Sequence, residues 1–193
     1  MIDKDRKKRL KFFLEEDKKA NPAYSSCWQT VNPYNSDADI SKFLKTLRMI
    51  EYLYDRRSIS PFFKLRKLWY AYQFKKLSIR LGFTIPAYVF GPGLRIIHRG
   101  TIIVHGGCKI GSNCIINACA VIGTEAGFVS KVPTIGNNVY IATGAKVFGD
   151  IYIADGCVIG ANAVVNKSFT EPNTIIAGVP AKAIGKVTKN FRH

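Results

Sequence analysis

The stretch from Ile135 to Val165 reads IGNNVYIATGAKVFGDIYIADGCVIGANAVV, and it decides the fold. An aliphatic residue returns at every sixth position, and the same step recurs upstream between Val104 and Ile122. The ten positions in this register are Val104, Ile110, Ile116, Ile122, Ile135, Ile141, Val147, Ile153, Ile159 and Val165. A period of six matches neither a helix nor an array of hairpins. It predicts short strands joined by turns in a coil, with the repeated aliphatic side chains stacked inside and three repeats in each triangular turn.

A β-sandwich is the alternative, because alternation with period two also places residues six apart on one face. The coil is favoured by a second regularity, a small or β-branched residue four positions after the aliphatic one. These residues are Cys108, Cys114, Ala120, Ala126, Val139, Ala145, Ile151, Cys157 and Ala163. Three cysteines share this inward position, so we interpret the cysteines as buried thiols.

Composition sets the class of protein. The chain has 193 residues, of which 47% are hydrophobic and 22% charged, so it is a globular protein with one core and at most a small appendage. The formal net charge of +16 favours a polyanionic partner such as nucleic acid, an anionic membrane face or a phosphorylated small molecule. Charge alone does not choose among these partners.

Targeting and metal signals are missing from the sequence. No run of about 18 apolar residues occurs, and Met1–Arg6 contains no apolar signal-peptide core, so we expect a cytoplasmic protein. The five cysteines form no CxxC pair and do not alternate with histidines at zinc spacing. We therefore expect reduced thiols and no metal site.

The first 82 residues are expected to be helical. Apolar residues spaced by three and four predict one helix from Asp39 to about Tyr54. Ser60-Pro61 is an N-cap followed by proline, and it begins a second helix that ends near Gly82. A short third helix is expected over Lys4–Lys18. The expected breaks are Pro22 and Asn32–Ser36.

The predicted helix 62–80 is both basic and aromatic. Its basic residues are Lys64, Arg66, Lys67, Lys75, Lys76 and Arg80, and its aromatic residues are Phe62, Phe63, Trp69, Tyr70, Tyr72 and Phe74. One interpretation is a face that contacts a membrane surface, at the inner side of the membrane, or an acceptor. The other, which we favour, is that the aromatic side chains pack on the coil while the charges are solvated.

The end of the repeat region, IAGVPAK at Ile176–Lys182, resembles the closing motif of the hexapeptide-repeat acyltransferases. More narrowly, residues 83–187 resemble serine acetyltransferases and the short, similar enzymes of bacterial surface-polysaccharide synthesis. The resemblance implies a mainly β protein, with a helical region at 1–82, a left-handed parallel β-helix at 83–178 and a tail at 179–193. It also implies acetyl-CoA as co-substrate and a homotrimer with active sites between neighbouring coils.

His98 lies in LRIIHRGTIIV, residues 94–104, which resembles the segment around the catalytic histidine of serine acetyltransferases. The resemblance implies that His98 is a general base, which takes the hydroxyl proton during attack on the thioester and returns it to the leaving thiolate. Candidates for substrate binding are His105, Arg99 and Glu125. The third histidine, His193, is at the chain end.

Two departures from the family pattern bear on the acceptor. The family aspartate fifteen residues before the catalytic histidine is replaced by Phe83, and a second family histidine associated with serine is replaced by Val132. We therefore expect a saccharide hydroxyl as acceptor, and a backbone carbonyl or Glu125 to orient His98. Serine O-acetylation, N-acetylation of an amino sugar and a non-enzymatic scaffold or nucleic-acid binder are the alternatives, and we expect no specific nucleic-acid partner.

The donor site follows from the resemblance and from the chemistry of coenzyme A. Small residues allow its long arm to approach the backbone, and lysines suit its phosphates. The implied binding residues are Thr143, Gly144, Ala161, Asn166, Lys167, Lys182 and Lys186. The 13-residue step from Ile122 to Ile135 equals two repeats plus one residue, so Thr124–Thr134 is expected to leave the coil as a loop suited to substrate contacts.

Overall fold

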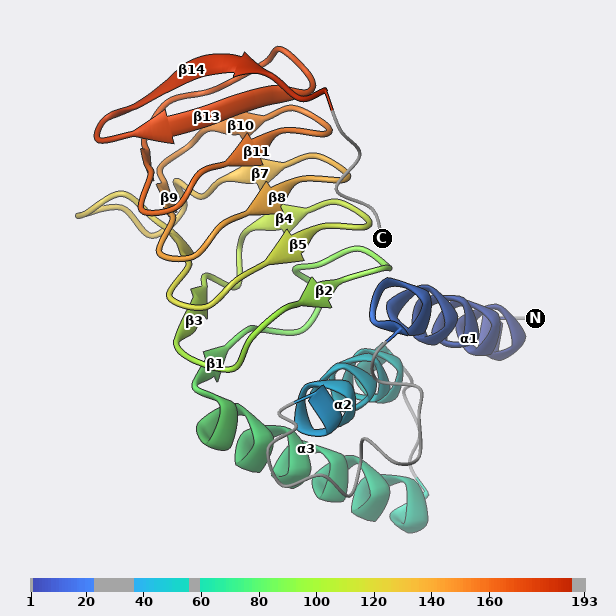
Figure 1. The fold of residues 1–193 in the computed structure, drawn as a ribbon. Helices are drawn as coiled ribbons and strands as arrows, with labels where there is room; N and C mark the ends of the chain where they lie inside the picture. Colours follow the sequence, from blue (N-terminus) through green and yellow to red (C-terminus); the bar gives the residue numbers. More distant parts are fainter. Residues whose placement is uncertain (1, 23–36, 56–59, 189–193) are drawn as a thin grey trace.

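The computed structural model describes residues 2–22, 37–55 and 60–188. Three helices come first, and a coil of short strands with a left-handed parallel β-helix architecture follows (Figure 1). Cys27, the predicted break at Asn32–Ser36 and His193 lie outside the described residues.

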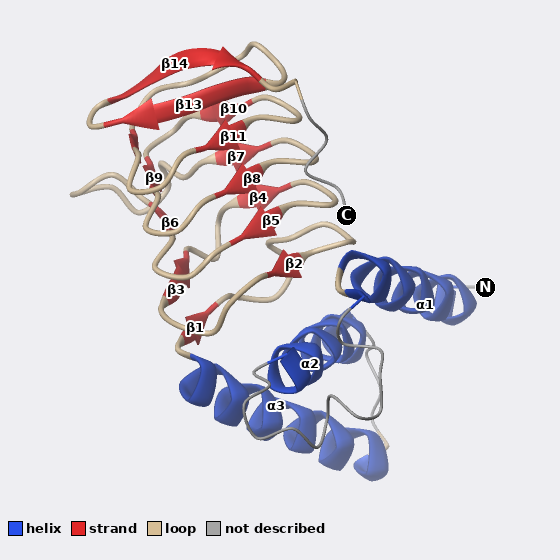
Figure 2. Ribbon diagram, viewed as in Figure 1, coloured by secondary structure: helices blue, strands red, loops and turns tan. Residues whose placement is uncertain are grey.

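The coil has three flat faces (Figure 2). Face A contains β1 (Phe83–Thr84), β3 (Ile102–Val104), β6 (Val121–Gly123), β9 (Lys146–Phe148) and β12 (Val164–Val165). Face B contains β4 (Lys109–Ile110), β7 (Thr134–Ile135) and β10 (Tyr152–Ile153). Face C contains β2 (Arg95–Ile96), β5 (Ile115–Ile116), β8 (Tyr140–Ile141), β11 (Val158–Ile159), β13 (Thr174–Gly178) and β14 (Ala181–Lys186). We call the corners where the chain passes between faces the AB, BC and CA edges.

Strand pairing confirms the six-residue register. Every strand pair is parallel except β13 with β14, which runs back over the last coil. The ten register residues are at most 4% exposed and form one core. The segment between β6 and β7 leaves the coil as predicted, and Val129 within it is 84% exposed.

The coil extends beyond the periodic positions at both ends. Phe90 and Ile96 lie under Ile110 and Ile116, and Phe169 and Ile176 lie above Ile153 and Ile159. The steps from Ile96 to Val104, from Val165 to Phe169 and from Phe169 to Ile176 are eight, four and seven residues. A search for a fixed period of six therefore misses these coils.

The helices are α1 (Ile2–Ala20), α2 (Asp37–Asp55) and α3 (Pro61–Leu81). α1 is longer than predicted, α2 begins two residues earlier, and α3 ends as predicted where Gly82 adopts a left-handed conformation with φ of 78°. Phe43 of α2 packs edge-on against Phe83 of the first coil, with ring centroids 5.1 Å apart. The core of the coil thus continues into α2 instead of ending at an open coil.

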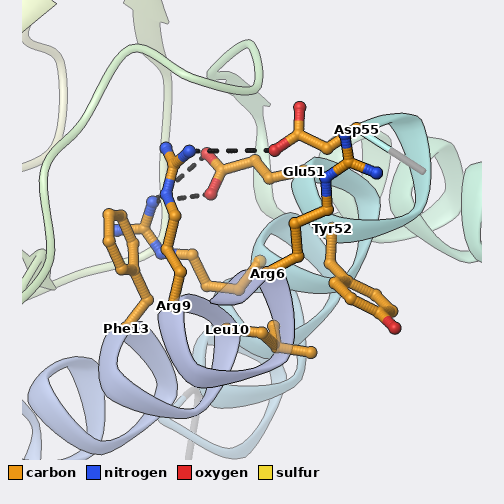
Figure 3. A pocket seen from close by; sticks show the side chains of 8 residues that line it. Arg6, Arg9, Leu10, Phe13, Glu51, Tyr52 and Asp55 are labelled. Atoms are coloured by element: carbon orange, nitrogen blue, oxygen red, sulfur yellow. Dashed lines mark hydrogen bonds and ion pairs between the residues drawn. The ribbon is translucent and has the colours of Figure 1, made fainter. Parts of the chain in front are cut away.

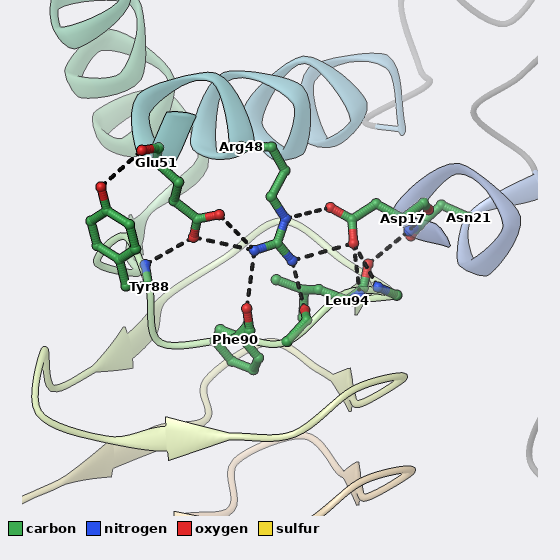
Figure 4. Close-up of polar contacts among 9 residues, drawn as sticks. Asp17, Asn21, Arg48, Glu51, Tyr88, Phe90 and Leu94 are labelled. Carbon is green, nitrogen blue, oxygen red and sulfur yellow. Dashed lines mark hydrogen bonds and ion pairs between the residues drawn. The ribbon is translucent and has the colours of Figure 1, made fainter. Parts of the chain in front are cut away.

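A buried polar network fastens the helices to the first coil (Figure 4). Arg48 of α2 is 1% exposed; it donates to Asp17 Oδ2 at 2.8 Å and to the carbonyls of Phe90 and Gly91 at 3.0 and 2.7 Å. Asp17 Oδ1 accepts from the backbone N–H groups of Gly93 and Leu94. Burial lowers the pKa of Arg48, but the ion pairs with Asp17 and Glu51 outweigh it, so the pKa is raised and the charge is kept.

A small cavity lies beside this network, between α1 and α2 (Figure 3). Its volume is about 20 Å³, and its lining includes Arg6, Arg9, Phe13 and Asp55. The Arg48 guanidinium carbon lies 4.7 Å from the centre of the Phe13 ring. A space of this size holds a water molecule and no substrate.

The favoured interpretation, in which the aromatic residues of this helix pack on the coil, is wrong for most of them. Phe62, Trp69 and Tyr72 are 75%, 54% and 63% exposed. Phe74 stacks on Phe43 with a centroid distance of 5.3 Å, and Phe63 is buried against α2. α3 is therefore apolar on two sides, and the described part of the chain packs against only one of them. Across the described ranges, no helix is long and apolar enough to span a bilayer.

Candidate functional site

His98 lies on the CA edge, at a corner longer than the others. The interior residues Ile96 and Val104 are eight positions apart, so this corner has two more residues than the corners of the regular coils. His98 and Arg99 are both exposed there. Gly100 closes the corner with φ of 133°, and its N–H donates to Leu81 O at 3.0 Å. A Cβ at Gly100 would lie 3.2 Å from Ala118 Cβ, so the corner rests directly on the next coil.

Backbone hydrogen bonds stack the corners of the CA edge. Cys119 N–H donates to Thr101 O at 2.6 Å, Gly144 N–H donates to Ala118 O at 3.0 Å, and Asn162 N–H donates to Thr143 O at 3.0 Å. Of the predicted donor-site residues, Thr143, Gly144 and Ala161 therefore lie on the same edge as His98. The corner residues Ala118 and Cys119 between them are small, and Lys146 Nζ donates to Cys119 O at 2.5 Å.

The predicted lysines are divided between edges. Lys182 of β14 pairs with Ala177, which contacts Gly160, so Lys182 lies at the upper end of the CA edge. Lys186 lies at the BC edge, where its Nζ donates to Pro172 O at 3.2 Å and to Thr174 Oγ1 at 3.3 Å. Asn166 and Lys167 follow β12 onto the AB edge and are exposed. The chain thus brings together four of the seven predicted donor-site residues.

The AB edge holds the second group of predicted residues. His105 Nδ1 accepts a hydrogen bond from Gly107 N–H at 3.1 Å, so neutral His105 carries its proton on Nε2. A Cβ at Gly107 would lie 3.4 Å from both His105 Nδ1 and Val132 Cγ2. His105 therefore lies beside the position at which the resembling family has its second histidine. The sequence gives no sign of this, because 27 residues separate the two positions.

No described residue of the same chain orients His98. Within the described ranges its imidazole has no hydrogen-bond partner, and Glu125 lies on the AB edge with Oε2 4.0 Å from Lys131 Nζ. Phe83, at the place of the family aspartate, is 3% exposed and belongs to the core. The prediction that Glu125 or a backbone carbonyl fixes the tautomer finds no support within one chain.

An open groove of about 530 Å³ adjoins the His98 corner. It runs between α3 and the first coil, and its lining includes Phe74, Lys75, Ser78, Phe83 and Thr84. It begins at Gly82, whose added Cβ would lie 3.2 Å from the carbonyl carbon of Gly100. The groove is large enough for a ligand of several rings.

The inward cysteines do not suit covalent chemistry. Burial raises the pKa of Cys108 to about 11 and that of Cys114 to about 12, and it also raises the pKa of Cys157. The fraction of nucleophilic thiolate is therefore very small near neutral pH. These three residues are at most 2% exposed, which confirms the interpretation of buried thiols for them.

Cys119 is different, and the buried-thiol interpretation is wrong for it. It is exposed on the CA edge between the His98 and Thr143 corners, with φ of 62°. The third residue after each register aliphatic is otherwise asparagine or glycine at the corners with positive φ, as at Asn138, Gly144 and Asn162. This exception to the repeat is the sequence signal that distinguishes Cys119. Among the described residues, no cluster of three His, Cys, Asp or Glu side chains could hold a metal ion.

Comparison with known proteins gives the same architecture. Residues 133–167 match the family model for bacterial transferase hexapeptide repeats. Serine acetyltransferase from Buchnera aphidicola is 33% identical over 105 residues, which cover 53% of this chain and 38% of that protein. The chain resembles the serine acetyltransferases. The enzyme from Mycobacterium tuberculosis is 35% identical over 103 residues, covering 52% of this chain and 44% of that protein. The matched segment thus spans about half or less of these relatives.

Solved structures extend the resemblance through the helices. Serine acetyltransferase from Brucella abortus covers 94% of this chain and 69% of its own, with a TM-score of 0.68 and 26% identity. The same enzyme in complex with coenzyme A has a TM-score of 0.67, again with 26% identity, and covers 94% and 68%. These relatives are named for serine, so the comparisons favour the serine alternative of the sequence analysis over the saccharide.

Proposed function

We propose that the protein is an acetyl-CoA-dependent O-acetyltransferase with its catalytic centre at the His98 corner. The observation that carries the proposal is the alignment of His98, Thr143, Gly144 and Ala161 on one edge of a coil whose structural relative binds coenzyme A. Serine is the acceptor that the relatives favour.

In this proposal His98 acts as general base. Its exposed imidazole takes the proton from the acceptor hydroxyl as the oxygen attacks the thioester carbonyl. The resulting imidazolium then protonates the leaving thiolate. Cys108, Cys114 and Cys157 are buried and take no part, and in this proposal the acetyl group passes directly from donor to acceptor.

The fit of the donor to the CA edge rests on its small residues. Gly144 has φ of 76°, and a Cβ there would meet the side chain of Asn162, so a larger residue is excluded at this corner. Ala118 and Ala161 likewise have side chains too short to project from this edge. We propose that the pantetheine arm lies along this edge and that Lys182 contacts a phosphate at its upper end. Asn166, Lys167 and Lys186 lie on other edges and would have to act from a neighbouring subunit.

A homotrimer is part of the proposal. His105, Glu125 and the loop at 124–133 lie on the AB edge, across face A from His98. Packing of identical coils around a threefold axis can bring the AB edge of one subunit to the CA edge of the next. A neighbour would then supply the groups that a single chain does not place beside His98.

A saccharide is the second candidate acceptor, and specific observations favour it. The groove beside the corner, at about 530 Å³, exceeds what serine fills, and its walls include the aromatic Phe74 and the polar Ser78. Phe83 places a buried ring where serine acetyltransferases have a carboxylate.

The test is release of free coenzyme A thiol from acetyl-CoA, with L-serine in one series and a panel of monosaccharides and oligosaccharides in the other. We expect acceptor-dependent release that falls by about 10²–10⁴-fold in His98→Ala. His193→Ala, at the chain end, is the matched histidine control and should retain activity. Release with serine identifies the first acceptor, and release with a saccharide alone identifies the second. Equal rates for wild type and His98→Ala would refute the assignment of the base.

A further inference from the structure

The outer side of α3 is an apolar stripe that no element within residues 2–22, 37–55 and 60–188 covers. It comprises Leu65, Leu68, Trp69, Tyr72 and Ile79, which are 54–73% exposed. Residues 65, 72 and 79 are seven apart, so they lie in line on one side of the helix. The opposite side carries Phe63 and Leu81, which are buried. A helix that is apolar all round is normally covered all round, and a contiguous exposed apolar stripe marks an interaction site.

Basic residues border this stripe on both flanks. At 100° per residue, Lys64 and Lys75 lie on one flank, Arg66 and Arg80 on the other, and Lys76 within the stripe. α3 contains no acidic residue. Among the described residues, Arg80 pairs with Asp39 at 2.9 Å, whereas Lys64, Lys75 and Lys76 form no ion pair. The face thus combines apolar side chains with three uncompensated lysines.

We propose that this face of α3 binds the surface of an anionic lipid bilayer. Aromatic and aliphatic side chains bordered by Lys and Arg are the composition of helices that lie in the membrane interface, where the apolar side enters the acyl boundary and the lysines contact lipid phosphates. α3 is the outermost element at the end of the molecule away from β14, so it can meet a flat surface without obstruction from the coil (Figure 1).

Charge argues against two other occupants. Packing α3 against α3 of a second copy would bring unpaired lysines together with no acidic residue on either helix to compensate them. Nucleic acid would satisfy the lysines but would leave Leu65, Leu68 and Ile79 in contact with phosphates and water. An anionic bilayer satisfies both kinds of side chain, and the overall charge of +16 adds long-range attraction.

The experiment is co-flotation of the full chain with vesicles of phosphatidylcholine alone or with phosphatidylglycerol added. We expect binding only to the anionic vesicles. Leu65→Ser with Tyr72→Ser removes two exposed apolar residues and should weaken binding at least about tenfold, because the apolar contact contributes beyond charge. Lys75→Gln with Lys76→Gln should weaken it by a similar factor and reduce its dependence on salt. Lys7→Gln with Lys8→Gln on α1 is the charge-matched control and should bind within about twofold of wild type.

A residue-specific signal separates docking by α3 from general attraction. In a Trp28→Phe background Trp69 is the only tryptophan of the chain, and its emission should shift to the blue and resist aqueous quenchers when anionic vesicles are added. Unchanged emission, or equal binding of the serine double variant and wild type, would mean that net charge alone attracts the protein and would overturn the proposal. A fall in oligomer size caused by the serine double variant without vesicles would assign the stripe to a second copy instead. The proposal does not rest on the acetyltransferase assignment, since none of its measurements uses activity.

Discussion

The first coil and the coils above it are built differently. From Val104 to Val165 the interior residues keep a six-residue step, interrupted only by the loop at 124–133, and each coil stacks on the next through parallel strand pairs. In the first coil the step reaches eight at the His98 corner, and Arg48 and Asp17 hold the backbone from Phe90 to Leu94. The candidate catalytic residue His98 therefore lies where the repeat is broken. The regular coils are the scaffold for the CA edge, along which the proposed donor site lies.

The loop at 124–133 is the second break, and removing it gives the largest expected effect. Deletion of Glu125–Lys131 shortens the step from Ile122 to Ile135 from thirteen residues to six and so restores the regular register. We expect a folded protein whose midpoint of thermal unfolding changes by a few degrees, because none of the deleted residues belongs to the core. Acetyl transfer should fall at least about 100-fold if the loop completes the site of a neighbouring subunit.

The measurement is acceptor-dependent release of coenzyme A, with binding of coenzyme A as the control. Retained binding with lost transfer assigns the loop to the acceptor or to the chemistry. Full activity of the deletion variant would show that the regular coil and the His98 corner suffice.

Removal of Arg48 tests how the first coil is held. Arg48→Ala leaves Asp17 and Glu51 buried without their cation and the carbonyls of Phe90 and Gly91 without a donor, so we expect a loss of about 3–5 kcal/mol in the free energy of unfolding. Arg80→Ala is the matched control: its ion pair with Asp39 is 2.9 Å long, but its side chain is 67% exposed, so its loss should cost about 1 kcal/mol or less.

Denaturant unfolding of the two variants measures the difference. Similar losses for both would mean that the network does not anchor the first coil. A large loss for Arg48→Ala alone would establish that the helices stabilise the irregular coil, which lacks the support of a regular repeat.

Much of the fold could be predicted from the period of the repeat. The ten register residues and the inward Cys108, Cys114 and Cys157 are buried as expected. Each regular coil has room for a small or β-branched side chain at the fourth position after the register residue. The first and last coils could not be found in this way, because steps of eight, four and seven residues have no period. The outward aromatic residues of α3 were assigned to packing, because a helix that is apolar on both sides does not reveal which side the protein covers.

The site was predictable only in part. His98 came from resemblance alone, because the eight-residue step that forms its corner breaks the period. The proximity of His105 and Val132 depends on a loop that leaves and rejoins the coil, and neither spacing nor composition encodes that path. Lys186 lies on the BC edge because β14 runs antiparallel to β13. The six-residue pattern does not predict this reversal of chain direction.

Chemical labelling of Cys119 tests the central claim, that the CA edge carries the donor toward His98. In a Cys27→Ser background Cys119 is the exposed thiol of this edge, whereas the other three cysteines are buried. We expect saturating coenzyme A to slow maleimide labelling of Cys119 at least about tenfold, because the pantetheine arm would cover this thiol. Glu171→Cys on the exposed BC edge, combined with Cys119→Ser, is the matched control and should stay reactive. Unchanged labelling of Cys119 with coenzyme A bound would contradict the account and place the donor on another edge.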